Sequence, residues 1–259
     1  MKRLTIILLT LAFVLGACAP APAKSQTIQV FAASSLTSAF GDIGKAFEVA
    51  YPGVTVNFNF GGSQTLRTQI EQGALADVFA SANAKEMDAL ITGKLVDSGT
   101  SQIFLTNQLV VILPAKNPAG LKTLDDLAKP GLKLVLAAKE VPAGNYTLQI
   151  IDKLDKITGA GFKDKVLANV VSYENDVKQV VSKVQIGEAD AGIVYVSDTT
   201  IAPDLLEIEI PAENNVIAQY PIAALSKSSN PDLAQAFIAY ILSDKGQSTL
   251  KKWGFLPVK

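Results

Sequence analysis

A direct passage from a strand into a helix, through a turn of small residues, constrains this chain more than any other feature. The segment TIQVFAASSLTSAF, residues 27–40, first alternates polar and apolar residues and then adopts helical spacing from Phe40 onward. Ser34 and Ser35 lie in the turn. The first N–H groups of a helix lack intrahelical partners and the helix dipole is positive there, so this turn could bind an anion. The alternative is that Ser34 or Ser35 only caps the helix.

The same pattern of strand, small-residue turn and helix recurs along the chain. Three further turns precede predicted helices, at Ser63, Ala143 and Val177. The predicted strands before them are residues 54–60, 132–138 and 166–173. Such alternation predicts an α/β fold, in which ligands bind beyond the carboxyl ends of the strands.

Two segments are predicted to cross between two lobes. A chain of 259 residues suits two domains better than one. The crossings, near residues 107 and 220, divide it into a first lobe of residues 27–106 and 220–259 and a second lobe of residues 107–219. Two crossings of this kind predict a hinged pair of lobes with a cleft between them.

The N-terminal segment predicts export. Residues 1–17 place Lys2 and Arg3 before an apolar run that is too short to span a membrane, as in a secretory signal peptide. The sequence LGAC resembles the lipobox of bacterial lipoproteins, so lipidation of Cys18 is expected, with residues 18–26 as a flexible tether. We expect a protein anchored to the outer face of the cytoplasmic membrane. The alternative is an ordinary signal peptide with a chance cysteine.

Composition excludes several classes of function. The chain has no histidine and one cysteine, which removes His-based acid–base catalysis, Ser-His-Asp and Cys-His nucleophiles and the usual zinc sites. A hydrolase using Ser35 or Ser63 would need a lysine base, and no lysine lies at a recognisable spacing. Without residues 1–17 the chain carries 21 basic and 24 acidic residues, so no nucleic-acid partner is expected.

The turns favour a fully ionised anion as ligand. Only Arg67 remains after the signal segment, so an arginine clamp is not expected. Neutral donors suit a dianion, because a protonated anion would also need an acceptor for its hydrogen. Ferric iron would require several anionic oxygen ligands, which these turns do not supply. Sulfate and phosphate remain open as alternatives on this reasoning.

Six motifs carry a resemblance to a known family. FAASSL, GGSQTL, ADVFASA, VPAGNY, ENDV and GIVYVSD, in this order, closely resemble the molybdate-binding proteins of bacterial ABC importers, from about Thr27 to Phe255. The resemblance implies a two-lobed type II periplasmic-binding-protein fold with mixed sheets. It also implies capture of molybdate or tungstate by hinge closure and delivery to an ABC permease. No catalysis, no cofactor and a monomer are expected.

The resemblance also assigns site residues. It implies hydroxyl donors on two serines and a tyrosine, and backbone N–H donors at an alanine and a valine: Ser35, Ser63, Tyr195, Ala143 and Val177. The sequence departs from the family pattern in two turns, and both departures change the expected number of hydroxyl donors. Ser34 adds a hydroxyl to the first turn, and Gly61 and Gly62 leave Ser63 as the only hydroxyl of the second. Ser34 and Asp176 could support the site without touching the anion.

Alternatives stay open for several residues. A related tungstate-binding group coordinates its metal with carboxylates, for which Glu174 or Asp176 would be the candidates. Asp176 could instead cap its helix, and Tyr195 could be a packed aromatic residue with its hydroxyl at the rim. Asp77 is expected to be structural or to act at the hinge, because an acid beside an anion is unfavourable. Arg67 is expected to be solvated. An anion sensor is a further alternative to transport.

Overall fold

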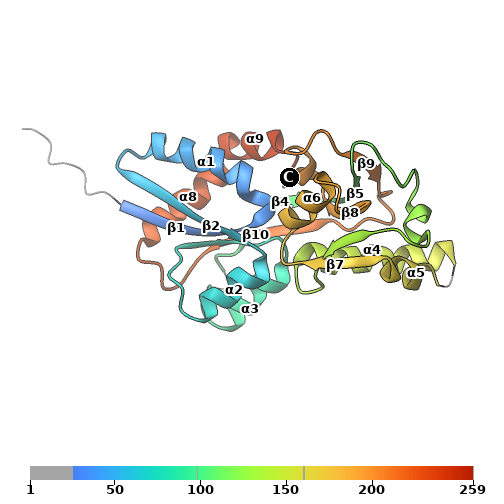
Figure 1. The fold of residues 1–259 in the computed structure, drawn as a ribbon. Coiled ribbons are helices and arrows are strands. Elements are labelled where there is room, and N and C mark those ends of the chain that lie inside the picture. Colours follow the sequence, from blue (N-terminus) through green and yellow to red (C-terminus); the bar gives the residue numbers. More distant parts are fainter. Residues whose placement is uncertain (1–25, 98, 160, 259) are drawn as a thin grey trace, which may run out of the picture.

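The computed structural model describes residues 26–97, 99–159 and 161–258, which form two mixed β-sheets flanked by helices (Figure 1). The signal peptide, Cys18 and most of the predicted tether lie outside the described residues. Gln26, the last residue of that tether, already belongs to the first strand, where it pairs with Val54.

The first sheet has six strands in the order β11-β4-β10-β3-β1-β2. Their bounds are Gln26–Ala33 for β1, Val54–Gly61 for β2, Val78–Ala80 for β3, Gln102–Asn107 for β4, Ala218–Ala224 for β10 and Leu256–Pro257 for β11. Strands β2 and β3 run parallel to β1, whereas β10 is antiparallel to both β3 and β4. The carboxyl ends of β1, β2 and β3 therefore meet at one edge, where ligands bind in folds of this kind.

Helices cover both faces of the first sheet (Figure 1). One group consists of α1 (Thr37–Ala50), α8 (Pro231–Leu242) and α9 (Asp244–Lys252), and the other of α2 (Ser63–Glu71) and α3 (Ala84–Thr92). Successive strand residues point to opposite faces. Accordingly, Val30 and Val78 belong to the large core cluster, whereas Phe31 and Phe79 pack in a separate cluster with α2 and α3.

The second sheet has five strands in the order β7-β6-β8-β5-β9. Their bounds are Leu109–Leu113 for β5, Leu134–Ala137 for β6, Val170–Glu174 for β7, Ala191–Tyr195 for β8 and Leu206–Glu209 for β9. The helices of this half are α4 (Pro142–Thr158), α5 (Phe162–Ala168), α6 (Val177–Gln185), α7 (Val196–Thr199) and the short 3-10 helix η2 (Leu124–Ala128). Strands β7 and β8 are parallel to β6, and β5 is antiparallel to β8 and β9. The predicted α/β fold with mixed sheets is thus confirmed.

Some predicted elements differ from the observed ones. The predicted strand of residues 166–173 is wrong at its start, because α5 continues to Ala168 and β7 begins only at Val170. Phe162 and Val166 lie one helical turn apart and are both buried, a spacing that indicates a helix and not a strand. Gln108, next to the crossing expected near residue 107, lies between β4 of the first sheet and β5 of the second.

Helix α3 was not predicted at all, although its sequence carries signals for it. The side chain of Asn83 caps the helix by accepting a hydrogen bond from the Glu86 N–H at 3.0 Å. Met87 and Leu90 lie three residues apart and are fully buried. A capping asparagine before apolar residues at helical spacing is a sufficient start signal.

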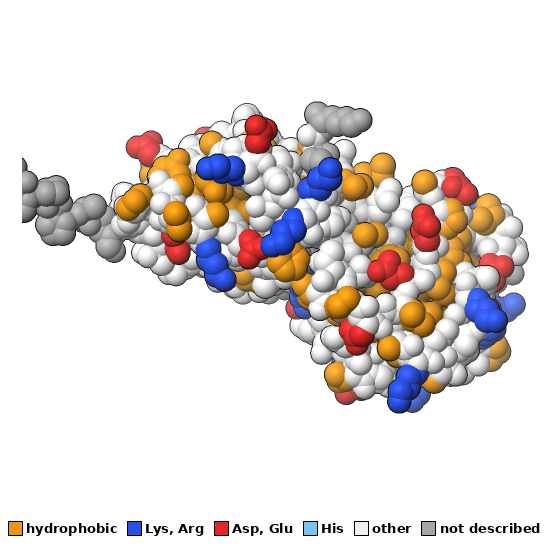
Figure 2. Space-filling view, turned by 90° about the horizontal axis from the view of Figure 1, so that it is seen from above, with side chains coloured by type: hydrophobic (Ala, Val, Ile, Leu, Met, Phe, Trp, Pro, Cys, Tyr) orange, Lys and Arg blue, Asp and Glu red, His pale blue; other side chains and the backbone are white. Residues whose placement is uncertain are grey.

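The face of the molecule seen in Figure 2 is mixed in character. Figure 2 shows acidic, basic and apolar side chains interspersed on the viewed face. No helix among the described residues has both the length and the apolar composition needed to cross a membrane.

Candidate anion-binding site

A small cavity lies where the helix starts of the two halves meet. Its lining is Ala33, Ser34, Ser35, Gly61, Gly62, Ser63, Ala82, Val141, Pro142, Ala143, Val177 and Tyr195. All five predicted ligand-binding residues and Ser34 are among them, whereas Asp176 is not. The centre of a water-sized sphere can occupy about 10 Å³ of the cavity, which is the room for one small group.

The serines of the first turn do not cap a helix. Ser34 and Ser35 form the 3-10 helix η1 (Ser34–Leu36) that leads into α1, and neither η1 nor α1 has a side-chain hydrogen bond at its N-cap. The N-caps of α2 and α4 also lack such a bond. The capping alternative is thus wrong for Ser34 and Ser35. Several first-turn N–H groups at this cavity have no side-chain acceptor, which is the arrangement that binds anions.

Helix α6 starts differently but also leaves a donor. Asp176 Oδ1 accepts hydrogen bonds from the N–H groups of Lys178 at 2.8 Å and Gln179 at 3.2 Å. Asp176 is therefore a helix cap, as one of the alternatives predicted. Val177, at the first helical position, lines the cavity, and the cap does not engage its N–H group.

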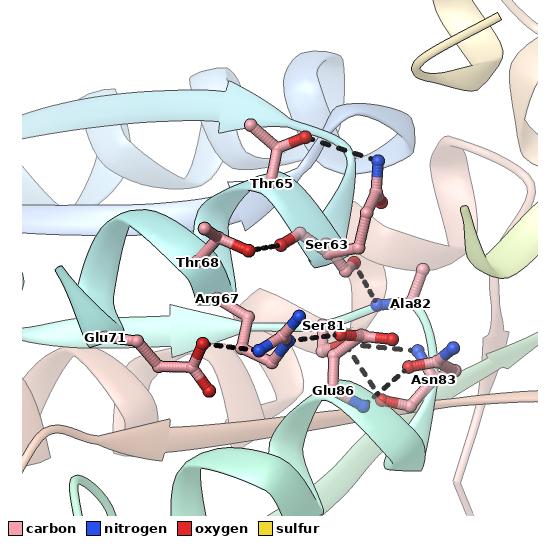
Figure 3. Close-up of polar contacts among 10 residues, drawn as sticks. Ser63, Thr65, Arg67, Thr68, Glu71, Ser81, Ala82, Asn83 and Glu86 are labelled. Atoms are coloured by element: carbon pink, nitrogen blue, oxygen red, sulfur yellow. Dashed lines mark hydrogen bonds and ion pairs between the residues drawn. The ribbon is translucent and has the colours of Figure 1, made fainter. Parts of the chain in front are cut away.

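Ser63 is oriented by the segment that follows β3. The Ala82 N–H donates to Ser63 Oγ at 3.0 Å, and Ser63 is only 1% exposed (Figure 3). A backbone N–H can only donate, so Ser63 Oγ must accept in this bond and its own hydrogen stays available for another acceptor. The serine is thereby prepared to donate to an anion in the cavity.

Ser35 has a partner that the sequence did not reveal. Its Oγ lies 3.0 Å from the hydroxyl of Tyr220 on β10, 185 residues away. Burial raises the pKa of Tyr220 above its ordinary value, so the phenol stays protonated. If Tyr220 donates in this bond, the Ser35 hydrogen is free for a ligand. A contact over this sequence distance gives no local signal, and Tyr220 was predicted only as part of the returning strand.

Tyr195 presents a buried polar group without a partner. The residue is 1% exposed, and its hydroxyl makes no hydrogen bond to the described residues. The ring packs edge-on against Tyr220, with 5.7 Å between ring centroids. Burial raises the pKa of Tyr195 well above its ordinary value, so it remains a donor. The alternative of a hydroxyl at the rim is wrong, because the group is buried beside the cavity and needs an acceptor.

The cavity lining carries no charged side chain, and the nearby carboxylates are already paired. Buried Asp198 accepts from Lys178 Nζ at 3.0 Å and from the Tyr195 N–H at 3.2 Å. Glu174 pairs with Lys183 at 2.7 Å. Among residues 26–97, 99–159 and 161–258, no group of three or more His, Cys, Asp or Glu side chains could hold a metal ion. The donors at the cavity are hydroxyl and N–H groups, which suit an anion and not a bare cation.

Two further predictions concern residues near the first sheet. Asp77 is structural: its carboxylate accepts from the Gln29 N–H at 2.7 Å and the Ser228 hydroxyl at 2.6 Å, at the amino end of β3 away from the cavity. The prediction of a solvated Arg67 is wrong. Arg67 Nε donates to buried Glu86 at 2.6 Å and its guanidinium also pairs with Glu71, which ties α2 to α3 (Figure 3).

The comparisons with known proteins agree on one family. The sequence model of the family described as bacterial extracellular solute-binding protein matches residues 28–256. The molybdate-binding protein ModA of Mycobacterium tuberculosis is 41% identical over 232 residues, covering 89% of this chain and 85% of the relative.

Solved structures agree in fold. The substrate-binding domain of a putative molybdenum ABC transporter from Clostridium difficile has a TM-score of 0.68 and 32% identity, with 91% of this chain and 100% of that chain covered. The periplasmic molybdate-binding protein of Azotobacter vinelandii has a TM-score of 0.79 with 90% of this chain and 100% of that chain covered, and at 21% identity it supports the fold alone. The resemblance drawn from the six motifs is confirmed, and the chain belongs to the family of bacterial extracellular solute-binding proteins.

Proposed function

We propose that this protein captures molybdate, and also tungstate, outside the cytoplasm and delivers it to an ABC importer. The observation that carries the proposal is the convergence of neutral donors from both halves on one small, uncharged cavity. The names of the relatives, which are molybdate-binding proteins, favour this oxyanion over others of the same shape.

The binding mechanism that we propose is hinge closure. Ser35 and Ser63 come from the first half, and Ala143, Val177 and Tyr195 from the second. These donors can contact one tetrahedral anion only when the halves, residues 27–106 with 220–259 and residues 107–219, approach each other. The anion binds the closed form better than the open form, so it shifts the population toward closure.

Selectivity would follow from the size of the cavity and the nature of the donors. Sulfate is also fully ionised at neutral pH, so its rejection would rest on the size of the cavity. A protonated phosphate needs an acceptor for its hydrogen, and the lining offers no carboxylate. A receptor that coordinates tungstate through carboxylates is disfavoured, because Glu174 is paired with Lys183 and Asp176 caps α6.

The remaining functional predictions belong to the same proposal. We infer that residues 1–17 direct export, that Cys18 carries a lipid anchor, and that the protein acts as a monomer without a cofactor or catalysis. The partner would be an ABC permease in the cytoplasmic membrane. A sensor would bind the same anion, so loss of molybdate uptake on deletion of the gene would support transport, and unchanged uptake would support sensing.

The proposal is tested by the thermal midpoint of the purified protein with molybdate, tungstate, sulfate or phosphate added separately. A ligand at a hundred times its Kd stabilises the folded protein by about 2.7 kcal/mol, which in a chain of this size raises the midpoint by about 5 to 11 °C. We expect this rise with molybdate and tungstate only. An equal rise with sulfate or phosphate would contradict the assigned anion, and no rise with any oxyanion would contradict the site.

A further inference from the structure

We propose that Gly62 determines how far the cleft can close, an inference that rests on the proposed function. Gly62 lies between β2 and α2 in the first half, and Asn175 lies between β7 and α6 in the second. A Cβ atom added at Gly62 would lie 2.5 Å from the backbone oxygen of Asn175. Real Cβ atoms do not approach an oxygen this closely, so any other residue would hold the two turns apart.

A hydrogen bond shows that the two turns are in contact. Gln64 Nε2, on the first turn of α2, donates to the same Asn175 oxygen at 3.2 Å. The contact lies next to the cavity, because Gly62 and Ser63 both line it and Val177 follows Asn175 by two residues. A contact between the halves and the anion donors thus lie at the same pair of helix starts.

The backbone of Gly62 does not itself require glycine. Its φ of −61° and ψ of 134° are extended values that alanine adopts without strain. Replacing glycine by alanine at such a position usually stabilises a protein, because the unfolded chain loses conformational freedom. The obstacle to a side chain is therefore the opposite half of the cleft. Gly62→Ala should leave an open form intact and oppose only the closed form.

The experiment compares Gly62→Ala with the wild-type protein in three measurements. Calorimetric titration gives the Kd for molybdate, stopped-flow mixing gives its dissociation rate, and small-angle X-ray scattering gives the radius of gyration with and without molybdate. We expect a Kd raised by about tenfold or more, as overpacking of a tight contact predicts, through faster dissociation. The radius of gyration at saturation should exceed that of the saturated wild type. The thermal midpoint without ligand should stay unchanged or rise.

A matched control is available in the same half of the molecule. Gly41 lies within α1, and a Cβ added there would meet nothing within 4 Å. Gly41→Ala should therefore leave the Kd and the closed radius of gyration unchanged. The added Cβ would lie 2.5 Å from the side-chain nitrogen of Gln64 as well as 2.5 Å from the Asn175 oxygen. A second variant shows which of these two groups is the obstacle. In the double variant Gly62→Ala, Gln64→Ala, the affinity should remain low, since the Asn175 oxygen is still present.

Several results would overturn the inference. Wild-type affinity in Gly62→Ala would do so, as would a weaker affinity with a saturated radius of gyration equal to that of the wild type, since the methyl group would then act on the anion directly. Restored affinity in the double variant would assign the obstacle to Gln64. If the wild type bound neither molybdate nor tungstate, the proposed function itself would fail, and this inference with it. Wild-type binding with an unaffected variant overturns only the role of Gly62.

Discussion

The two sides of the cavity supply hydrogen-bond donors of different kinds. The side formed by the first sheet adds the side-chain hydroxyls of Ser34, Ser35 and Ser63 to the N–H groups of its helix starts. The side formed by the second sheet relies mainly on N–H groups at Ala143 and Val177. The exception on the second side is the hydroxyl of Tyr195, which belongs to β8. Side-chain donors can be removed by ordinary substitution. Backbone donors depend on where a helix starts, so they tolerate most changes of side chain.

The largest effect is expected from Val177→Pro, which removes a backbone donor on the second side of the cavity. Proline is tolerated at the first position of a helix, where its missing N–H has no helical partner, and Asp176 before it already has an extended backbone with φ −160° and ψ 167°. The substitution removes a hydrogen bond to a charged ligand, so we expect the binding free energy for molybdate to weaken by about 1.5 to 3 kcal/mol. Calorimetric titration measures the loss.

Val177→Ala is the control for that variant. Val177 is 2% exposed and packs in the core, so both substitutions should lower the free energy of unfolding. Alanine keeps the N–H group, however, and its Kd should stay within about twofold of the wild type. If alanine weakened binding as much as proline, the backbone N–H of Val177 would not be a ligand donor.

Ser63→Ala removes a side-chain donor on the first side of the cavity. We expect the binding free energy to weaken by about 1 to 3 kcal/mol, since a hydrogen bond to a charged group is lost. The Ala82 N–H also loses its acceptor, so the free energy of unfolding, measured by urea titration without ligand, should fall by about 1 to 3 kcal/mol. An unchanged Kd in a folded variant would remove Ser63 from the site.

Tyr220→Phe tests whether the hydroxyl of Ser35 depends on a hydrogen-bond partner outside the cavity. Tyr220 contacts Ser35 and does not line the cavity, so the loss in binding free energy should be smaller, about 0.5 to 1.5 kcal/mol. Tyr51→Phe, at the half-exposed far end of α1, is the control and should bind as the wild type does. An unchanged Kd for molybdate in Tyr220→Phe would show that Ser35 needs no orienting partner.

The smallest effect is expected from pH. Tyr195 is the one titratable side chain among the lining residues, and burial raises its pKa well above the ordinary value. Deprotonation would remove a donor and add a negative charge, and the raised pKa moves that loss to higher pH. The Kd for a fully ionised anion should therefore change by less than about twofold between pH 7 and pH 9. A steep rise in Kd within this range would show that another group titrates at the site.

The two kinds of donor also explain what the sequence could predict. Serines in a turn between a strand and a helix are visible in the sequence, and so are the signals of a helix start such as Pro142 and Asp176. These signals were enough to locate Ser35, Ser63, Ala143 and Val177 at one cavity once the topology brought the strand ends together. The family resemblance supplied the ligand, which the turns alone left open.

Long-range contacts could not be predicted in the same way. Tyr220 meets Ser35 across 185 residues, and Asn175 meets Gly62 and Gln64 across the cleft, so neither contact has a local pattern. The pairing of Arg67 with Glu86 belongs to the same class, because it depends on the packing of α2 against α3. The error at residues 166–173 was of another kind. A run of apolar residues fits either a strand or a helix. The helical spacing of the buried residues Phe162 and Val166 indicates that the segment up to Ala168 is a helix.

A crystal structure of the protein with molybdate, in which the metal is located by its anomalous scattering, tests these donors most directly. We expect one anion in the cavity, with its oxygens at about 2.7 to 3.1 Å from the hydroxyls of Ser35, Ser63 and Tyr195 and from backbone N–H groups that include those of Ala143 and Val177. An anion bound elsewhere, or coordinated by a carboxylate such as Glu174, would contradict the central claim that neutral donors from both halves hold the ligand.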